Sequence, residues 1–230
     1  IGGNDRYETA AKIAEDRNGA NINVVLASGQ DFPDALSSGY LANQLNGASI
    51  LLTKQASLPA VTTEAIRNLG VRTVYLIGGT GAISAGVEAQ LRATTAYLPQ
   101  GQITLGSAKL QVIRLGGANR FVTNRIVNQR AAAVSVNATA VGRTQITFGQ
   151  SSKLTALVAT GNDFADALAA GPATAGSRLA GFGNLPLILT RPTTLDPNAS
   201  SQLNSFGIQQ AVILGLTGAV SAGVESSIAA

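Results

Sequence analysis

Short apolar runs recur along this chain and are separated by longer segments that have helical spacing. Each run is continuous rather than alternating, which is typical of strands buried on both faces of a parallel sheet. The pattern therefore predicts strands at Val24–Ala27, Ile50–Thr53, Val74–Ile77, Leu154–Thr160, Leu185–Thr190 and Ala211–Gly215.

The segments between these runs predict helices. Several begin with proline and one ends at Gly70, which is the asymmetry expected of helix ends. Ser84 is placed to cap a helix that buries Val87 and Leu91. The predicted helices are Pro33–Leu45, Pro59–Leu69, Ser84–Arg92, Phe164–Leu179, Pro197–Phe206 and Ser221–Ala229. Strands that alternate with helices form βαβ units, so the fold class is α/β, with parallel sheets in Rossmann-like lobes.

The two halves of the chain carry the same motifs in the same order. Ile1-Gly-Gly-Asn-Asp-Arg-Tyr7 recurs as Leu115-Gly-Gly-Ala-Asn-Arg-Phe121, and Val74–Glu88 recurs as Ala211–Glu225. A duplication of this kind defines the folding unit. We therefore expect two tandem repeats, one at residues 1–113 and the other at residues 114–230.

Two segments fall outside the repeated pattern. Tyr97–Gln111 contains proline and glycine, which predicts a loop or a β-excursion between the lobes. Val134–Ser152 is an insertion in the second copy, and within it Thr144–Phe148 is expected to form an additional hairpin strand.

The composition excludes several classes of function. The chain has no cysteine and no histidine, so thiolate catalysis, Ser-His-Asp relays and most zinc, haem or iron–sulfur sites cannot form. We therefore expect no catalytic residues, no metal and no cofactor. No apolar run approaches the roughly 20 residues of a membrane span. The absence of both cysteine and methionine leaves little to oxidise, which is consistent with an extracellular location.

The charge balance favours an anionic partner. The net charge is +4 while only 12% of the residues are charged, so the chain attracts anions at long range without a concentrated basic patch. It has no run of Lys or Arg and few aromatic side chains that would stack on bases. These features argue against a nucleic-acid partner.

Asp-Phe-x-Asp-Ala-Leu occurs at Asp31–Leu36 and again at Asp163–Leu168, where a predicted strand ends and a helix begins. Ligands of open α/β sheets bind outside the carboxyl ends of the strands. One interpretation is structural, with the first aspartate capping the helix and the second complementing its positive end. In the other interpretation, Asp34 and Asp166 accept hydrogen bonds from a sugar hydroxyl or a partner arginine.

Gly-Gly-x-x-Arg precedes a helix in both copies, with the arginine at Arg6 and Arg120 and a threonine three residues later at Thr9 and Thr123. Arg114 adds a second guanidinium just before the second turn. Arginine holds phosphate or carboxylate through a bidentate fork. The alternative is that these arginines tie adjacent lobes together through an aspartate or a carbonyl group.

The glycine-rich turn at Gly78–Ser84 follows a strand and precedes a helix, so it has the setting of a dinucleotide site. However, Ser84 stands where glycine or alanine is expected, and no acidic residue follows at the ribose distance. In the second copy Leu216 replaces Gly79. A tight turn with close helix packing accounts better for these glycines.

Several linked motifs, taken together, resemble the type 2 cell-wall-binding repeat of S-layer proteins and other surface proteins of Gram-positive bacteria. In the first copy they are RYETA at 6–10, SGQDFPDALSSG at 28–39, ILLT at 50–53 and YLIGGTGAIS at 75–84. In the second copy they are RLGGANRF at 114–121, TGNDFADALAAG at 160–171, LILT at 187–190 and VILGLTGAVS at 212–221.

The resemblance implies non-covalent anchoring to an anionic secondary cell-wall glycopolymer at the cell surface, without catalysis. Family members usually carry three such repeats. Only two are visible here, which leaves room for a third repeat from a neighbouring chain or for a homo-oligomer. An alternative function is structural, in which the repeats make chain-to-chain contacts in a surface array or filament. With Arg114 added, the candidate ligand-binding residues are Arg6, Thr9, Ser28, Asp34, Thr53, Arg114, Arg120, Thr123, Thr160, Asp166 and Thr190.

Overall fold

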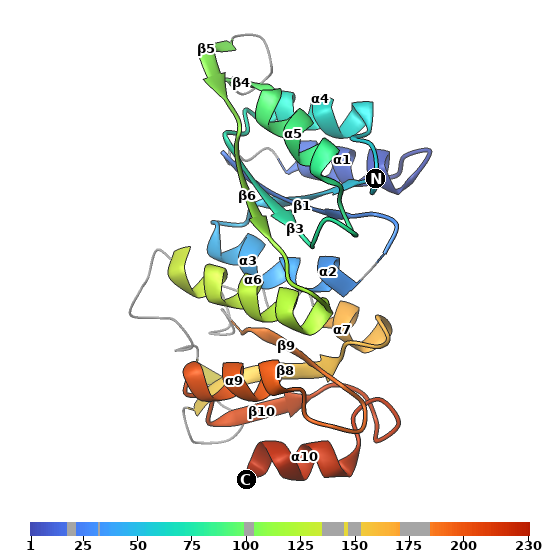
Figure 1. Cartoon of the computed structure of the whole chain (residues 1–230), viewed down its shortest axis with the longest axis vertical. Helices are drawn as coiled ribbons and strands as arrows, with labels where there is room; N and C mark the ends of the chain where they lie inside the picture. Colours follow the sequence, from blue (N-terminus) through green and yellow to red (C-terminus); the bar gives the residue numbers. More distant parts are fainter. Residues whose placement is uncertain (18–21, 32, 99–103, 135–144, 147–152, 171–184) are drawn as a thin grey trace.

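The structure is a computed structural model that describes residues 1–17, 22–31, 33–98, 104–134, 145–146, 153–170 and 185–230. Two α/β lobes lie one above the other along the long axis of the molecule, with the two chain ends in different lobes (Figure 1). Each lobe is built on a sheet with parallel strands. The predicted fold class is therefore confirmed.

The sheet of the first lobe has four parallel strands in the order β2-β1-β3-β6. They are β1 (Asn23–Ser28), β2 (Ser49–Thr53), β3 (Thr73–Ile77) and β6 (Gln111–Leu115). The predicted runs form the first three strands, and in β1 every residue after Asn23 is buried. In the ladder between β1 and β2, Ser28 is opposite Thr53, so these two hydroxyl side chains end neighbouring strands.

Helices cover both faces of this sheet. The helices α1 (Arg6–Asp16), α4 (Ala60–Asn68) and α5 (Ala85–Ala93) share one apolar core with the sheet, and the helices α3 (Ser38–Gln44) and α6 (Arg120–Val134) share the other. Ser84 caps α5 by accepting a hydrogen bond from Val87 N at 3.3 Å, and Val87 and Leu91 are buried, as predicted.

The predicted helix at Pro33–Leu45 is divided into α2 (Pro33–Leu36) and α3. Its turn lies at Ser37, whose hydroxyl accepts a hydrogen bond from the Asn124 side chain of α6 at 3.1 Å. The segment before β6 contains β4 (Thr95–Tyr97) and β5 (Thr104–Lys109), which pair as an antiparallel ribbon. The expected β-excursion is thus present.

β6 is a strand that the sequence pattern did not predict. It pairs in parallel with β3 through Gln111–Leu115 and so completes the first sheet. The repeat boundary expected between residues 113 and 114 falls inside this strand. After β6 the chain passes through residues 116–119 and enters α6.

The second lobe reproduces the central part of the first. β8 (Lys153–Thr160) lies between β9 (Leu187–Thr190) and β10 (Gln210–Ile213), with both pairs parallel. Thr160 is opposite Thr190, as Ser28 is opposite Thr53 in the first lobe. β7 (Gln145–Ile146) lies within the predicted hairpin strand and pairs antiparallel with β8, while residues 144, 147 and 148 of that prediction lie outside the described chain.

The described helices of the second lobe are α7 (Ala165–Ala169), α9 (Pro197–Ser205) and α10 (Ala222–Ala229). The predicted helix at Phe164–Leu179 is therefore described only as far as α7 and the residue that follows it, because residues 171–184 lie outside the described chain. Among the described residues, no helix is long and apolar enough to cross a membrane.

α6 joins the two lobes. Val127 and Ala131 belong to the core of the first lobe, whereas Phe121 packs with Leu157, Leu187 and their neighbours in the second. Figure 1 shows α6 lying between the two sheets. A single helix thus contributes to both cores.

Candidate functional site

The carboxyl end of β1 carries a compact cluster of contacts around Gly29. Arg6 donates from Nη1 to the Gly29 carbonyl at 2.6 Å, and Gly29 N donates to the Thr53 carbonyl at 2.9 Å. The Tyr7 ring lies against Gly29, where a Cβ would stand 2.6 Å from Tyr7 Cε1. The Lys54 ammonium lies 5.7 Å from the centroid of the same ring. We call Arg6, Tyr7, Gly29, Thr53 and Lys54 the Gly29 cluster.

The second lobe repeats this arrangement around Gly161. Arg120 donates from Nη1 to the Gly161 carbonyl at 2.5 Å, and Gly161 N donates to the Thr190 carbonyl at 2.9 Å. Phe121 lies against Gly161, and the Arg191 guanidinium is 5.0 Å from the Phe121 centroid. We call Arg120, Phe121, Gly161, Thr190 and Arg191 the Gly161 cluster. Each cluster places two cations at the carboxyl edge of its sheet.

The Gly-Gly turns that carry Arg6 and Arg120 have the same hydrogen bonds. Asp5 Oδ1 accepts from the backbone N–H groups of Tyr7 and Glu8, and Asn119 Oδ1 accepts from Phe121 and Val122. Asparagine and aspartate are equally good caps, so the change at position 119 preserves the turn.

The predicted hydroxyl residues mainly hold these turns in place. Thr9 Oγ1 accepts from Gly3 N at 3.0 Å, and Thr123 Oγ1 accepts from Gly117 N at 3.1 Å. Ser28 and Thr160 accept from backbone N–H groups of the loops that follow them. Thr53 and Thr190 are fully buried and donate to loop carbonyls. These side chains therefore position the clusters and present little surface to a ligand.

A small hollow of about 210 Å³ opens between the lobes beside the Gly161 cluster. Asp31 and Asp34 of the first lobe line it together with Asn119, Arg120 and Thr123 from the start of α6. Asp34, Arg120 and Thr123 are thus brought together as a site between lobes. The volume is below the roughly 300–1,000 Å³ that is typical of small-molecule pockets.

Burial raises the pKa of the Asp34 carboxyl above its ordinary value, and the negative charge of Asp31 acts in the same direction. A hydrogen bond from Thr123 and the positive charge of Arg120 oppose this rise in the pKa. The Asp34 side chain also lies beneath Gly78, where a Cβ would stand 2.5 Å from Asp34 Oδ2. Asp166 has the equivalent place beneath Gly215 in the second lobe.

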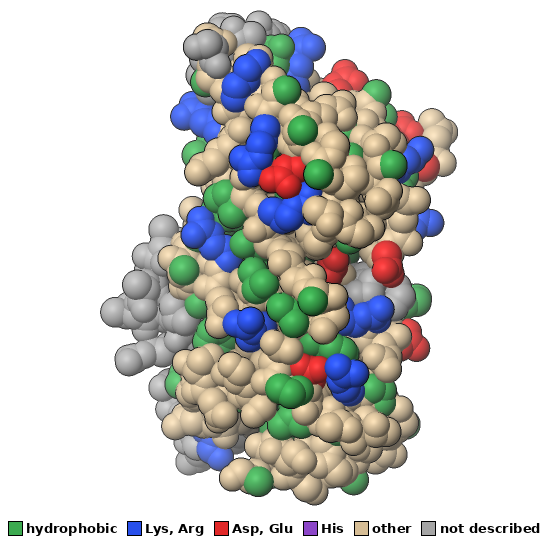
Figure 2. Space-filling view, viewed as in Figure 1, with side chains coloured by type: hydrophobic (Ala, Val, Ile, Leu, Met, Phe, Trp, Pro, Cys, Tyr) green, Lys and Arg blue, Asp and Glu red, His purple; other side chains and the backbone are tan. Residues whose placement is uncertain are grey.

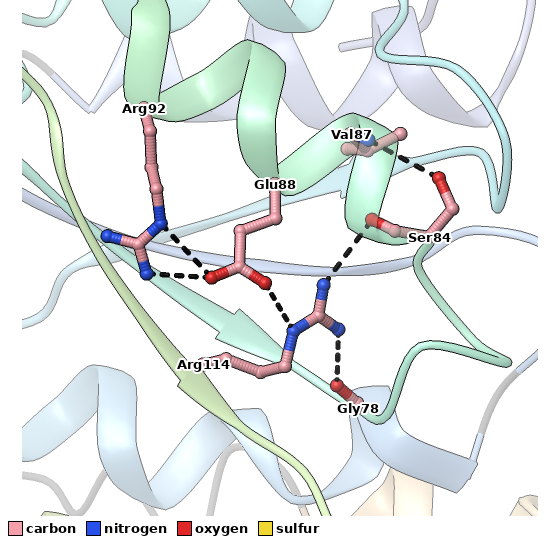
Figure 3. Close-up of polar contacts among 6 residues, drawn as sticks. All are labelled: Gly78, Ser84, Val87, Glu88, Arg92 and Arg114. Carbon is pink, nitrogen blue, oxygen red and sulfur yellow. Dashed lines mark hydrogen bonds and ion pairs between the residues drawn. The ribbon is translucent and has the colours of Figure 1, made fainter.

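Arg114 lies apart from these clusters. It donates from Nε to Glu88 at 2.7 Å, from Nη1 to the Gly78 carbonyl at 2.8 Å and from Nη2 to the Ser84 carbonyl at 3.4 Å (Figure 3). Its side chain is 17% exposed. Arg114 therefore joins β6 to α5 inside the first lobe, which is the role of a structural tie.

The sequence pattern did not single out Lys54, Arg191, Glu88 or Asn124. Lys54 and Arg191 follow the Leu-Thr end of corresponding strands, and this shared position is the signal that could have found them. Glu88 and Asn124 act through tertiary contacts. In the sequence, Glu88 only ends a repeated motif and Asn124 only replaces the Ala10 of the first copy. Figure 2 shows basic side chains spread over the visible face of both lobes, with fewer acidic ones between them.

The sequence comparison settles the family. The model of cell wall binding domain 2 (CWB2) matches residues 1–88 and 114–225, which is most of the chain. The chain belongs to the CWB2 family. It is a cell wall binding module, and its family points to the cell wall or cell surface as its location.

Two proteins of Bacillus subtilis (strain 168) are similar to this CWB2 chain. One is N-acetylmuramoyl-L-alanine amidase LytC, 27% identical over 96% of this chain and 36% of the relative. The other is the amidase enhancer, 28% identical over 98% of this chain and 25% of the relative. The CWB2 chain therefore spans only about a quarter to a third of these proteins.

Two solved cell wall protein structures from Clostridium difficile have the same fold. Cwp8 matches with a TM-score of 0.70 and 27% identity, over 98% of this chain and 32% of that protein. Cwp6 matches with a TM-score of 0.72 and 21% identity, over 100% of this chain and 31% of that protein. The predicted resemblance to the cell-wall-binding family is thereby confirmed.

Proposed function

We propose that this CWB2 chain is a non-catalytic module that anchors a protein to the cell wall by binding an anionic secondary cell-wall polymer. The observation that carries the proposal is the repetition of the Gly29 cluster as the Gly161 cluster. In each cluster an arginine donates to a glycine carbonyl and a second cation lies over an aromatic ring. Both cations are at the carboxyl edge of a parallel sheet, where α/β proteins bind ligands.

The charges at this edge fit an acidic polymer. Arg6 and Lys54 are exposed, and the Arg191 side chain is 53% exposed although its Nε donates to Asp196 Oδ2 at 3.0 Å. Each fixed cation attracts a phosphate or carboxylate group of a passing chain, and the shallow hollow beside Asp34 and Arg120 accepts a sugar substituent. The absence of histidine and cysteine from the sequence agrees with binding rather than catalysis.

The proposal is tested by measuring retention on purified Gram-positive walls before and after extraction of secondary polymers. Lys54→Gln combined with Arg6→Gln removes two cations from the Gly29 cluster. Since exposed ion pairs contribute about 0.2–1 kcal/mol each, the affinity should fall roughly 2- to 30-fold and become less sensitive to salt.

A matched control removes an arginine and a lysine from the opposite end of the same sheet. Arg72 and Lys109 are exposed and precede β3 and β6, at the amino ends of the strands. Arg72→Gln combined with Lys109→Gln should leave retention unchanged. Equal losses in both double variants, or equal retention on extracted walls, would reject this binding edge.

A further inference from the structure

The loops that follow the Gly29 cluster and the Gly161 cluster have the same backbone geometry but differ in charge. Thr53 and Thr190 each donate a hydroxyl hydrogen bond to the carbonyl group four residues later. The helix after each loop begins at an extended residue, which is Pro59 (φ −60°, ψ 143°) before α4 and Asp196 (φ −65°, ψ 136°) before α9. The second lobe therefore has a carboxylate at a position where the first lobe has proline.

The Asp196 carboxylate is paired with the exposed cation of the Gly161 cluster. Its Oδ2 accepts from Arg191 Nε at 3.0 Å, and its Oδ1 accepts from the backbone N–H and the side chain of Asn198, both at 2.9 Å. Asp196 is 2% exposed, and a buried charge is costly unless it is paired. An anionic ligand that drew Arg191 away would leave this carboxylate without its partner, so Arg191 binds such a ligand at a disadvantage.

Lys54 is the counterpart of Arg191 in the Gly29 cluster, and its charge is not compensated in this way. None of the salt bridges found among the described residues includes Lys54. The side chain is exposed, and its ammonium group lies 5.7 Å from the centroid of the Tyr7 ring. The face of an aromatic ring attracts a cation without cancelling its charge. Lys54 is therefore held in place while it still attracts anions.

The arginines of the two clusters differ in the same direction. Arg120 lines the hollow between the lobes together with Asp34, and its positive charge acts on the Asp34 carboxyl. Arg6 is exposed, and Glu8 beside it is already in an ion pair within α1. Asp5 accepts hydrogen bonds from the first turn of α1, whose positive end it complements. The Gly29 cluster thus carries more uncompensated positive charge than the Gly161 cluster.

We propose that the two clusters are unequal, and that the Gly29 cluster is the one that binds a phosphate or carboxylate group of the polymer, through Lys54 and Arg6. Asp196 is an internal counter-ion that keeps the Gly161 cluster a weak site for anions. This inference rests on the proposed function, because it names the part of the binding edge that meets the charge of the wall polymer.

The first test uses soluble inorganic polyphosphate as the probe and the lysines of the unmodified chain as reporters. Limited acetylation followed by mass spectrometry measures how far the probe protects each ammonium group. We expect polyphosphate to slow the acetylation of Lys54 and to leave Lys109 and Lys153 unchanged, since these two lie just before β6 and at the start of β8, at the amino ends of the strands. Equal protection of all three lysines, or no protection of Lys54, would overturn the inference.

The second test exchanges the charge between the equivalent helix starts. Asp196→Asn keeps a capping side chain but frees Arg191, so the affinity for polyphosphate should rise about 2- to 5-fold, the change expected for one exposed ion pair. Pro59→Asp places a carboxylate beside Lys54 and should lower the affinity by a similar factor. Glu64→Gln, at an exposed position of α4, changes the net charge as much as Asp196→Asn and is the control that should not raise the affinity by this factor. Melting temperatures verify that each variant is folded.

The inference and the proposed function fail in different ways. If Asp196→Asn or Pro59→Asp leaves the affinity unchanged, or if Arg191→Gln costs as much as Lys54→Gln, the clusters are equivalent and the inference is wrong, even where wall retention still depends on secondary polymers. If walls retain the chain equally after extraction while polyphosphate still protects Lys54, the proposed function is wrong and the inequality of the clusters stands.

Discussion

At the scale of single residues, Glu88 takes part in two of the ion pairs found among the described residues of the first lobe. Its carboxylate accepts from Arg92 and from Arg114, both at 2.7 Å, and its side chain is 20% exposed (Figure 3). Hydrogen bonds from Arg114 and then from Arg92 lower the pKa of Glu88 below its ordinary value. A carboxyl with a lowered folded pKa stabilises the fold above its unfolded pKa, and this stability is lost as the pH falls through the folded value.

Glu88→Gln is therefore expected to reduce the free energy of unfolding at pH 7 by about 1.5–3 kcal/mol, the range for a hydrogen-bonded charged group. The difference from the unmodified chain should shrink as the pH falls below the ordinary glutamate pKa of 4.5. Urea denaturation at several pH values measures both effects. Glu225→Gln is the matched control from the second repeat and should show neither. A pH-independent loss would contradict the ionic role of Glu88.

The tertiary contacts of single side chains could not be predicted from the sequence. The pattern identified Arg6, Arg120 and Arg114 as guanidinium groups at turns, but it could not tell that Arg114 faces Glu88, 26 residues away in the chain. Lys54 and Arg191 became candidate binding residues only because they lie over the rings of Tyr7 and Phe121 in the folded chain. Such pairings depend on how elements cross, and local spacing does not encode them.

At the scale of elements, the ends of β3 and β6 approach so closely that only glycine fits at positions 78 and 116. A Cβ on Gly116 would overlap the carbonyl group of Gly78 and stand 2.5 Å from Gly79 N. Gly78 itself has a φ of 111°, a conformation that side chains other than glycine rarely adopt. The ends of β3 and β6 can therefore meet only through bare backbone.

Gly116→Ala is expected to destabilise the chain by about 1–3 kcal/mol, because the added methyl group must displace backbone. Calorimetry should show a melting temperature several degrees lower. Gly2 is its counterpart in the first repeat, and a methyl group added there would meet no atom within 4 Å. Gly2→Ala should therefore leave the melting temperature unchanged, and a similar fall in both variants would contradict the crowding at Gly116.

Most helices and strands could be predicted from the sequence because particular residue types mark where they begin and end. Continuous apolar runs identify β1, β3 and β8, and the serine cap of α5 fixes where that helix begins. β6 was missed because Arg114 interrupts its apolar pattern. The arginine is tolerated there because Glu88 and two carbonyl groups satisfy its charge and its N–H groups.

At the scale of the whole molecule, a buried polar network joins the lobes. Asn124 is fully buried; its Nδ2 donates to Ser37 Oγ at 3.1 Å and to the Leu187 carbonyl at 2.9 Å, and its Oδ1 accepts from Leu189 N at 3.1 Å. It thereby ties α6 to the edge of β9 and to the turn between α2 and α3. The repeat counterpart of Asn124 is Ala10, so this network is particular to the joint between lobes.

Asn124→Ala is expected to reduce the free energy of unfolding by about 2–4 kcal/mol, because buried partners lose hydrogen bonds that are worth about 1–3 kcal/mol each. Chemical denaturation measures this loss, and hydrogen exchange should show faster exchange at Leu189. Asn204→Ala, at an exposed position of α9, is the control and should be nearly neutral. A loss below about 0.5 kcal/mol for Asn124→Ala would contradict the network.

The direction of β6 also determines how a pulling force would act on the first sheet. This strand runs along the long axis of the molecule toward the second lobe, and the α6 helix that follows it lies across that axis (Figure 1). A force that pulls the two lobes apart along this axis therefore acts along the strand rather than across it. All the rungs of the ladder from Thr73–Gln111 to Ile77–Leu115 carry that load together instead of opening one at a time.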